Sequence, residues 1–174
     1  MKKVMMTMMM LAVAISLTAS CGQRQQSAAS IEQMTVEEGK MAPDFELPDL
    51  QGKPTKLSSL RGKYVVIDFW GAWCIWCVRG IPNMKEAYAK HKDKMEILGV
   101  DCRDTEAKWK AAVKEHELPW KQVRCPDDKF RNLMEQYSIE GFPTKVILDP
   151  KGKIVKVVTG EDPSFYTFLD SLFE

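Results

Sequence analysis

The sequence predicts an α/β domain in which helices flank a mixed central sheet. Three observations point to this fold class. Residues 64–70 (YVVIDFW) form an apolar run that is typical of a strand buried on both faces of a parallel sheet. Segments with helical and strand periodicity then alternate along the chain. Two last strands, at 145–148 and 154–158, are joined by the turn sequence DPKG, which predicts an antiparallel hairpin.

The remaining elements follow from hydrophobic periodicity and from capping residues. They are, in chain order, an N-terminal hairpin around 51–53, a helix after 77, a strand at 95–100, a helix after 105, a strand at 121–124, a helix at 130–137 and a last helix from 163 to 172. Pro82 is expected to kink the first long helix or to mark its restart. Asp104 or Thr105 can cap the next helix, and Asp162 can cap the last one with Pro163 in its first position.

The first 20 residues are predicted to be a secretory signal peptide. Lys2 and Lys3 give it a positive start, a mostly apolar stretch follows, and the segment ends on the small residues Thr18, Ala19 and Ser20. No stop-transfer pattern follows, and the apolar stretch is too short to indicate a membrane span. The protein is therefore expected to be exported.

Cys21 directly follows these small residues, and LTASC resembles a bacterial lipobox, in which this cysteine carries a lipid. A typical lipobox has its Leu three residues before the cysteine, whereas Leu17 lies four before it. The alternative is an ordinary signal peptide with an incidental cysteine. We expect residues 21–39 to form a flexible, lipid-anchored tether and residues 40–174 to form one domain. The domain would then face the periplasm or the cell exterior.

Charge and cysteine content narrow the classes of function. The chain has 25 basic and 24 acidic residues, interspersed and without a long basic tract, so nothing indicates a nucleic-acid partner, and we expect a monomer. In an oxidising compartment thiols pair unless something reduces them. Besides the lipobox cysteine the chain has an even number of cysteines, which permits two disulfides: Cys74, Cys77, Cys102 and Cys125.

Cys74 and Cys77, in the stretch WGAWCIWC, are the candidate redox pair. Cys74 follows a buried strand and opens a helix, whose N-terminal N–H groups and dipole favour a thiolate and lower the pKa of Cys74. Cys77 lies one turn further, within disulfide range, and is expected to be the less exposed of the two. Cys74 would attack a substrate disulfide, and Cys77 would resolve the mixed disulfide.

Other uses of a CxxC motif fit this sequence less well. A c-type haem site needs a His after the second cysteine, where the chain has Val78. A structural zinc site needs a second ligand pair, and His91 and His116 are lone helical histidines. Cys102 and Cys125 could complete a four-thiolate site, but an exported domain of this size does not require one. A purely structural disulfide would close too short a loop to add much stability. We expect no metal and no cofactor other than the redox-active disulfide.

Three stretches of the chain carry a more specific resemblance. Residues 42–77, the GFPT sequence at 141–144 and residues 145–160 resemble the TlpA/ResA branch of the thioredoxin-like family, which consists of exported or membrane-anchored thiol-disulfide oxidoreductases. The WCxxC motif, Pro82 five residues after the second cysteine and the Gly-x-Pro-Thr loop together are far more specific than CxxC alone. The resemblance covers about residues 40–174 and implies a thioredoxin-like fold with a helix-strand insert.

The resemblance also implies roles for individual residues. Cys74 would attack and Cys77 would resolve, while Pro143 would be a cis-proline that lies against the disulfide. Phe142 would present its backbone to an extended substrate segment. The expected substrate-binding residues surround the pair: Trp73, Ile75, Trp76, Gly141, Phe142 and Thr144. Among the tryptophans, we expect Trp70 in the core, Trp73 to shield the pair from water, and Trp76 to be partly exposed on the rim.

Asp68 lies inside the apolar strand, six residues before Cys74. An unpaired buried carboxylate is costly, so its pKa is expected to be raised. In thioredoxin an acid at this position accepts the proton of the resolving cysteine, whereas many TlpA/ResA-type proteins carry a Glu three residues after that cysteine. This chain has Gly80 there. We infer that Asp68 is the general acid/base for Cys77; the alternative is a structural carboxylate paired with a nearby Lys.

Cys102 and Cys125 each end a predicted strand. Because the carboxyl ends of parallel strands meet at one edge of the sheet, a second disulfide between them is possible, and it could relay electrons. Two separate thiols are the alternative.

The sequence leaves three functions to compare. The resemblance implies a reductase of client protein disulfides, which receives electrons from a membrane thiol transporter, with apocytochromes among its clients. A peroxidase shares this fold, but peroxiredoxins carry Thr three residues before the reactive cysteine, where this chain has Gly71. A non-catalytic client-binding module would use the aromatic surface of Trp73, Trp76 and Phe142.

Overall fold

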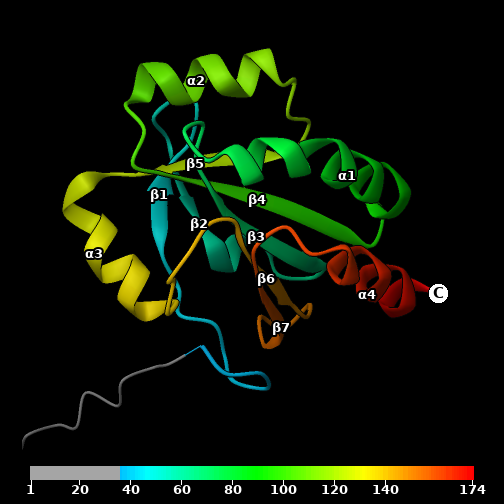
Figure 1. The fold of residues 1–174 in the computed structure, drawn as a ribbon. Helices are drawn as coiled ribbons and strands as arrows, with labels where there is room; N and C mark the ends of the chain where they lie inside the picture. Colours follow the sequence, from blue (N-terminus) through cyan, green and yellow to red (C-terminus); the bar gives the residue numbers. More distant parts are fainter. Residues whose placement is uncertain (1–35) are drawn as a thin grey trace, which may run out of the picture. The chain divides into compact units, whose positions relative to one another are not determined.

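The structure is a computed structural model that describes residues 36–174. The predicted signal peptide, Cys21 and most of the predicted tether lie outside the described residues. In chain order, the elements are β1 (Glu46–Pro48), β2 (Pro54–Lys56), η1 (Leu57–Leu60), β3 (Tyr64–Trp70), α1 (Ile75–His91), β4 (Met95–Cys102), α2 (Glu106–Glu115), β5 (Lys121–Cys125), α3 (Asp127–Gln136), β6 (Thr144–Leu148), β7 (Ile154–Thr159) and α4 (Pro163–Phe173), as Figure 1 shows.

A five-stranded sheet in the order β5-β4-β3-β6-β7 forms the centre of the domain. β3, β4 and β5 run parallel to one another, whereas β6 and β7 are antiparallel to their neighbours. β1 and β2 form a separate antiparallel hairpin. The predicted mixed sheet, N-terminal hairpin and C-terminal hairpin are confirmed.

The side chains of β3 alternate between the two faces of the sheet, because successive residues of a strand point to opposite sides. Val65, Ile67 and Phe69 pack in a cluster with Leu133 of α3 and with residues of the N-terminal hairpin and η1. Val66 packs with residues of α1 and α4, and Trp70 packs with residues of α2. One face of the sheet is therefore covered by α3 and the N-terminal segment, and the other by the remaining three helices (Figure 1).

The helix termini follow the predicted capping residues, with two differences. Thr105 caps α2 through a hydrogen bond from Lys108 N, and Asp162 caps α4. α1 continues through Pro82, so of the two predicted outcomes, a kink or a restart, the restart is not seen; the helix tolerates the loss of the one backbone hydrogen bond that the proline cannot donate. α3 begins at Asp127 rather than at 130, because acidic residues in a first turn are stabilised by the helix dipole.

The described N-terminal segment is bound to both outer strands of the sheet. Gly39 N donates to Ile154 O over 2.7 Å, and Ile154 N donates to Lys40 O over 2.8 Å, at the start of β7. Further along, Asp49 forms an antiparallel bridge with Val123 of β5. Gly39 and Lys40, at the predicted boundary between tether and domain, are thus hydrogen-bonded to the central sheet.

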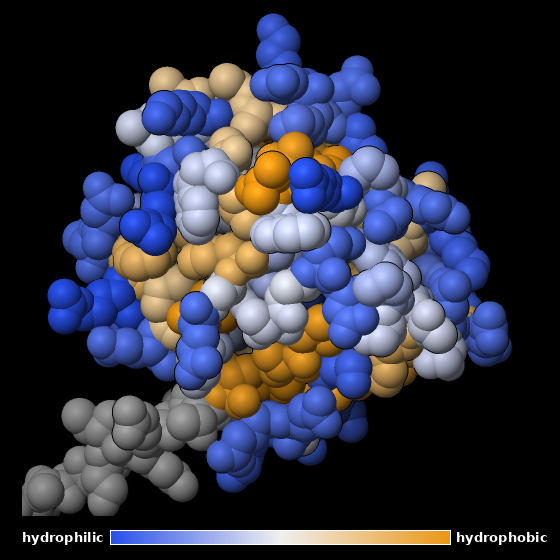
Figure 2. Space-filling model, in the orientation of Figure 1, coloured by the Kyte–Doolittle hydropathy of each residue, from blue (hydrophilic) through white to orange (hydrophobic). Residues whose placement is uncertain are grey.

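The face of the domain shown in Figure 2 is mainly hydrophilic. On the face shown in Figure 2, charged and polar residues dominate, and apolar residues appear in separate patches between them. Among residues 36–174, no helix combines the length and the apolar character needed to cross a membrane.

Candidate active site

Cys74 and Cys77 are joined by a disulfide at the point where β3 leads into α1. Cys74 is the N-cap of α1, and its Sγ accepts a hydrogen bond from Cys77 N over 3.2 Å. In the reduced protein the same N–H group and the helix dipole would stabilise a thiolate on Cys74. The geometry therefore suits Cys74 as the attacking cysteine.

The disulfide is enclosed by aromatic side chains. Trp70 and Trp109 of α2 pack with both cysteines in one buried cluster. Each cysteine is only 6% exposed, so the expected difference in exposure between the two is not seen in the oxidised protein. The prediction that Trp70 lies in the core is confirmed. Trp109, on a helix far along the chain, was not singled out from the sequence.

Trp73 and Trp76 lie on the rim of the site. Trp73 is 48% exposed, its Nε1 donates to Cys102 O over 2.8 Å, and its ring meets that of Phe142 edge-on at 5.3 Å. A Cβ at position 71 would lie 2.9 Å from Trp73 Cδ1 and nearer still to Nε1, so Gly71 leaves room for this indole. Trp76 is 57% exposed, as predicted.

The exposed aromatic rings are bordered by basic side chains. The guanidinium of Arg79 lies 5.0 Å from the centre of the Trp76 ring, and that of Arg103 lies 5.4 Å from Trp73. Ile75 is exposed between the two tryptophans in the sequence. The rim therefore offers an apolar surface beside the disulfide, with positive charge at its border.

The loop before β6 completes the site. The peptide bond between Phe142 and Pro143 is cis, as the resemblance implied. Phe142 packs against the cluster that contains both cysteines. Thr144 is buried, and its hydroxyl donates to Gly141 O over 2.8 Å, so it holds the loop rather than facing a substrate. Gly160 N donates to Pro143 O over 2.7 Å and ties the loop to the end of β7.

Asp68 is buried on the face of the sheet that carries α1 and α4, and its Oδ1 has no hydrogen-bond partner among the described residues. Burial raises the pKa of Asp68 to about 6, Lys145 opposes the shift, and Glu161 adds to it. The expected rise is confirmed. Lys145 lies directly opposite Asp68 in the register of β3 and β6, but its ammonium binds Glu161, with Nζ 2.7 Å from Oε2. The alternative interpretation was that Asp68 is a structural carboxylate paired with a nearby Lys. Lys145 is nearby, but its hydrogen bond goes to Glu161 and not to Asp68.

Glu161 was missed by the sequence analysis. A Cβ at Gly80 would lie 2.5 Å from the carboxylate carbon of Glu161, so this carboxylate fills the space beside the position at which the resemblance implied a Glu. It comes from the segment between β7 and α4. Two signals in the sequence pointed here: the glycine in a helix at position 80, and Lys145 within the apolar strand sequence KVIL.

Comparison with known proteins agrees with this geometry. A family model described as AhpC/TSA family matches residues 39–157. The chain belongs to the AhpC/TSA family. It is 39% identical over 124 residues to a thiol-disulfide oxidoreductase ResA of Bacillus cereus, a match that covers 71% of this chain and 70% of that relative. A ResA of Geobacillus thermodenitrificans is 32% identical over 92% of this chain and 91% of its own length.

Solved structures give the same result. The thioredoxin domain of a thiol-disulfide oxidoreductase from Bacteroides vulgatus matches with a TM-score of 0.74 and 34% identity, over 79% of this chain and 99% of that one. A thiol:disulfide interchange protein from Bacteroides sp. matches with a TM-score of 0.71 and 35% identity, over 78% of this chain and 90% of that one. The protein is a thiol-disulfide oxidoreductase with a thioredoxin-like fold.

Two further cysteines within residues 36–174 of the oxidoreductase lie on the opposite face of the sheet from the redox pair. Cys102 and Cys125 are register partners at the ends of β4 and β5, but both are free thiols, so the structure has the two separate thiols rather than the possible second disulfide. Side-chain alternation places them with Leu133 in the cluster under α3. Their Sγ atoms point to separate backbone carbonyls, and burial raises the pKa of Cys102 and raises that of Cys125 to about 11. This position does not suit an electron relay to Cys77.

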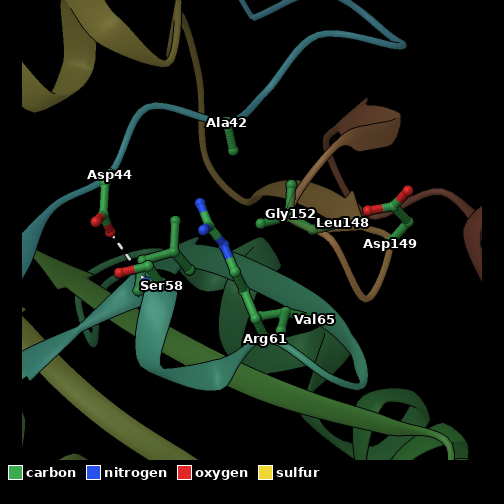
Figure 3. Close-up of a pocket in the computed structure, with 9 residues that line it drawn as sticks. Ala42, Asp44, Ser58, Arg61, Val65, Leu148, Asp149 and Gly152 are labelled. Atoms are coloured by element: carbon green, nitrogen blue, oxygen red, sulfur yellow. Dashed lines mark hydrogen bonds between the residues drawn. The ribbon is translucent and has the colours of Figure 1, made fainter.

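The pocket drawn in Figure 3 lies away from the redox pair. It is formed around Val65 and Leu148, which pair between β3 and β6 at the end of β6 that is remote from Thr144. Within this pocket, Asp44 Oδ1 accepts a hydrogen bond from Ser58 N over 3.0 Å. Its lining contains no cysteine. Across residues 36–174, no three His, Cys, Asp or Glu side chains are grouped so that they could hold a metal ion.

Asp68→Asn is expected to stabilise the protein while it slows the reaction. The folded state binds a proton on Asp68 more tightly than the unfolded state, so stability falls as pH rises from about 4 to about 6. At pH 7 the buried charge of Asp68 lowers the free energy of unfolding by about 2–3 kcal/mol, and the uncharged amide of Asn would not have this cost. Urea unfolding of both proteins between pH 4 and pH 7.5 measures the difference. Parallel stability curves for wild type and variant would contradict the raised pKa.

Proposed function

We propose that the protein is a membrane-tethered reductase of client protein disulfides. The observation that carries the chemistry is the position of Cys74: it caps α1, accepts the Cys77 N–H and lies in one cluster with Phe142 of the cis-proline loop. A thiolate favoured at this position can attack a disulfide that reaches the rim.

The reaction follows two exchange steps. The reduced Cys74 thiolate attacks one sulfur of the client disulfide; a Cys74–client S–S bond forms, and the other client sulfur leaves as a thiolate. Cys77 then loses its proton to the Asp68 carboxylate and attacks Cys74 Sγ, which forms the Cys74–Cys77 bond and releases the second client thiolate. The client gains two electrons, and the enzyme ends in the oxidised state seen in the structure.

The client would bind as an extended segment beside the rim. The backbone of Phe142 offers main-chain pairing, which makes limited demands on sequence. Ile75, Trp76 and the exposed part of Trp73 supply apolar contact, and Arg79 and Arg103 favour clients that carry acidic residues nearby. Proteins with unfolded segments around an accessible disulfide fit this surface best.

The reducing direction and the tether rest on the resemblance to the TlpA/ResA branch and on the sequence around Cys21. A membrane protein of the thiol-transporter type would return the Cys74–Cys77 disulfide to the dithiol, and apocytochromes are among the expected clients. The described chain starts beside Ile154, at the end of β7 distant from Thr144 and the cis-proline loop. A domain held by its N-terminal segment would therefore be attached at the end remote from the redox pair.

Trapping in the native cell tests the proposal. Cys77→Ser should leave clients bound to Cys74 as mixed disulfides that dithiothreitol releases, and apocytochromes or other reducible exported proteins should be among them. The full chain should fractionate with membranes, and Cys21→Ser should release it. A trap that contains only newly secreted proteins on their way to oxidation would favour an oxidase. Rapid turnover of hydrogen peroxide by the purified protein would favour a peroxidase.

A further inference from the structure

A cluster of buried and half-buried polar side chains lies next to the part of α1 that carries the resolving cysteine. It consists of Asp68, Lys145, Glu161 and Tyr166, which come from β3, β6, the segment after β7 and α4. The exchange reaction described above uses only Asp68. That reaction gives no role to the other three residues of the cluster.

The carboxylate of Glu161 is fixed from two sides. Lys145 Nζ lies 2.7 Å from Oε2, and the Tyr166 hydroxyl donates to Oε1 over 2.6 Å. Gly80 supplies the space, since its missing Cβ would lie 2.5 Å from the carboxylate carbon. Gly80 is buried three residues after Cys77, on the same side of α1. The charge of Glu161 is thus held about one helical turn from the resolving cysteine.

Glu161 and Asp68 compete for one cation. Lys145 is the register partner of Asp68, and its ammonium could bind either carboxylate, but it binds Glu161, and Asp68 Oδ1 has no hydrogen-bond partner among the described residues. The side chain of Lys145 is only 2% exposed, and that of Glu161 is 13% exposed. Glu161 therefore both engages the buried ammonium and connects the cluster to solvent.

We propose that Glu161 is a positioning residue for the resolution step: it holds Lys145 away from Asp68 and so keeps Asp68 basic enough to take the proton of Cys77. The proposal deepens the proposed function and rests on exchange at Cys74–Cys77. When that proton moves to Asp68, the Cys77 thiolate forms the S–S bond with Cys74, and the client sulfur leaves with the electron pair of the broken bond.

The charges around Asp68 support this assignment. Glu161 acts to raise the pKa of Asp68, and Lys145 acts to lower it. On β4 the register partner of Asp68 is Gly99, which carries no charge. The titratable groups that interact with Asp68 come from β4, β6, the segment after β7 and α4: Cys102, Lys145, Glu161 and Tyr166.

The test measures the resolution step directly. Reduced protein reacts with 5,5′-dithiobis(2-nitrobenzoate), which places one thionitrobenzoate on Cys74, and Cys77 then displaces it. The rate of this second release is followed from about pH 4 to pH 9. In the plot of this rate against pH, one limb rises as Asp68 loses its proton. Glu161→Gln should move this limb to lower pH by about one unit, because Lys145 can then stabilise the Asp68 carboxylate. The plateau should fall about threefold, because a weaker base remains. Asp68→Asn should abolish the limb.

Two further variants separate this effect from a general loss of structure or charge. Glu140→Gln removes one charge at an exposed position next to the cis-proline loop and should leave the profile unchanged. Gly80→Ala keeps every charge but pushes the flexible Glu161 carboxylate aside, so it should shift the limb in the same direction as Glu161→Gln. Carbon-13 NMR of the Asp68 carboxyl in the oxidised protein gives an independent midpoint, which Glu161→Gln should lower.

Profiles and NMR midpoints that are the same in wild type and Glu161→Gln would overturn the proposal and leave exchange at Cys74–Cys77 intact. A wild-type protein that releases no second thionitrobenzoate would instead overturn the exchange function on which the proposal rests.

Discussion

Cys74→Ser is expected to abolish reduction of protein disulfides, with a rate at least ~1,000-fold below that of the wild type. A serine hydroxyl cannot replace the cysteine, because the species that attacks a disulfide is a thiolate. Cys77→Ser should keep the first attack and stop at the mixed disulfide, since no second thiolate follows. Reduction of insulin with dithiothreitol as electron source measures turnover, and intact mass identifies the trapped adduct.

The free cysteines supply the matched control. Cys125→Ala removes a thiol from the opposite face of the sheet, in the cluster with Leu133, and should leave turnover within about twofold of the wild type. A Cys125→Ala variant as inactive as Cys74→Ser would show that the exchange chemistry is not confined to the CxxC pair.

Lys145→Met is expected to lower the free energy of unfolding by about 3–5 kcal/mol at pH 7. The substitution preserves an unbranched apolar chain of similar length but removes the cation that faces both Asp68 and Glu161. A buried carboxylate without its partner bears the full cost of its lost hydration. Part of the loss should be recovered near pH 5, where protonation of Asp68 removes one of the two charges. Urea unfolding at the two pH values measures both effects.

The double variant Lys145→Met/Glu161→Gln decides whether charge is the cause. With the ammonium and one carboxylate both neutral, the double variant should be clearly more stable than Lys145→Met alone, because replacing both members of a buried pair costs little. Equal stability of the single and double variants would mean that Lys145 acts through packing, for example against the Phe165 ring, 5.3 Å from its ammonium.

Local patterns were sufficient to predict most of the fold. The apolar run of β3, the DPKG turn and the capping residues Thr105 and Asp162 determine structure over short distances, and these elements appear where expected. Pro82 was harder to interpret, because a proline within a helix removes one hydrogen bond whether or not the packing around it keeps the helix continuous.

The sequence was sufficient to place the residues near the CxxC motif, but not those that the fold brings to them. The disulfide, the cis peptide before Pro143 and the buried Asp68 follow from the motif and the resemblance. Lys145 and Glu161 lie far from the motif, and their contact depends on the register of β3 with β6 and on the space at Gly80. No periodicity in a single sequence encodes that contact.

Cys102 and Cys125 show the limit of reasoning from strand ends alone. Both do end neighbouring strands, but the face on which a side chain lies depends on its parity along the strand. On β4, Cys102 shares its parity with Val100 and so points under α3. An error of one residue in a predicted strand end would reverse that assignment, which is why the sequence could place these thiols at the correct edge but not on the correct face.

The N-terminal segment that binds Ile154 and Val123 has a consequence for solubility. β5 and β7 are the outer strands of the central sheet, and an outer strand offers unpaired N–H and C=O groups to any other extended chain. Backbone from residues 39–49 occupies part of each outer strand. Copies of the domain would therefore have fewer open strand edges through which to aggregate.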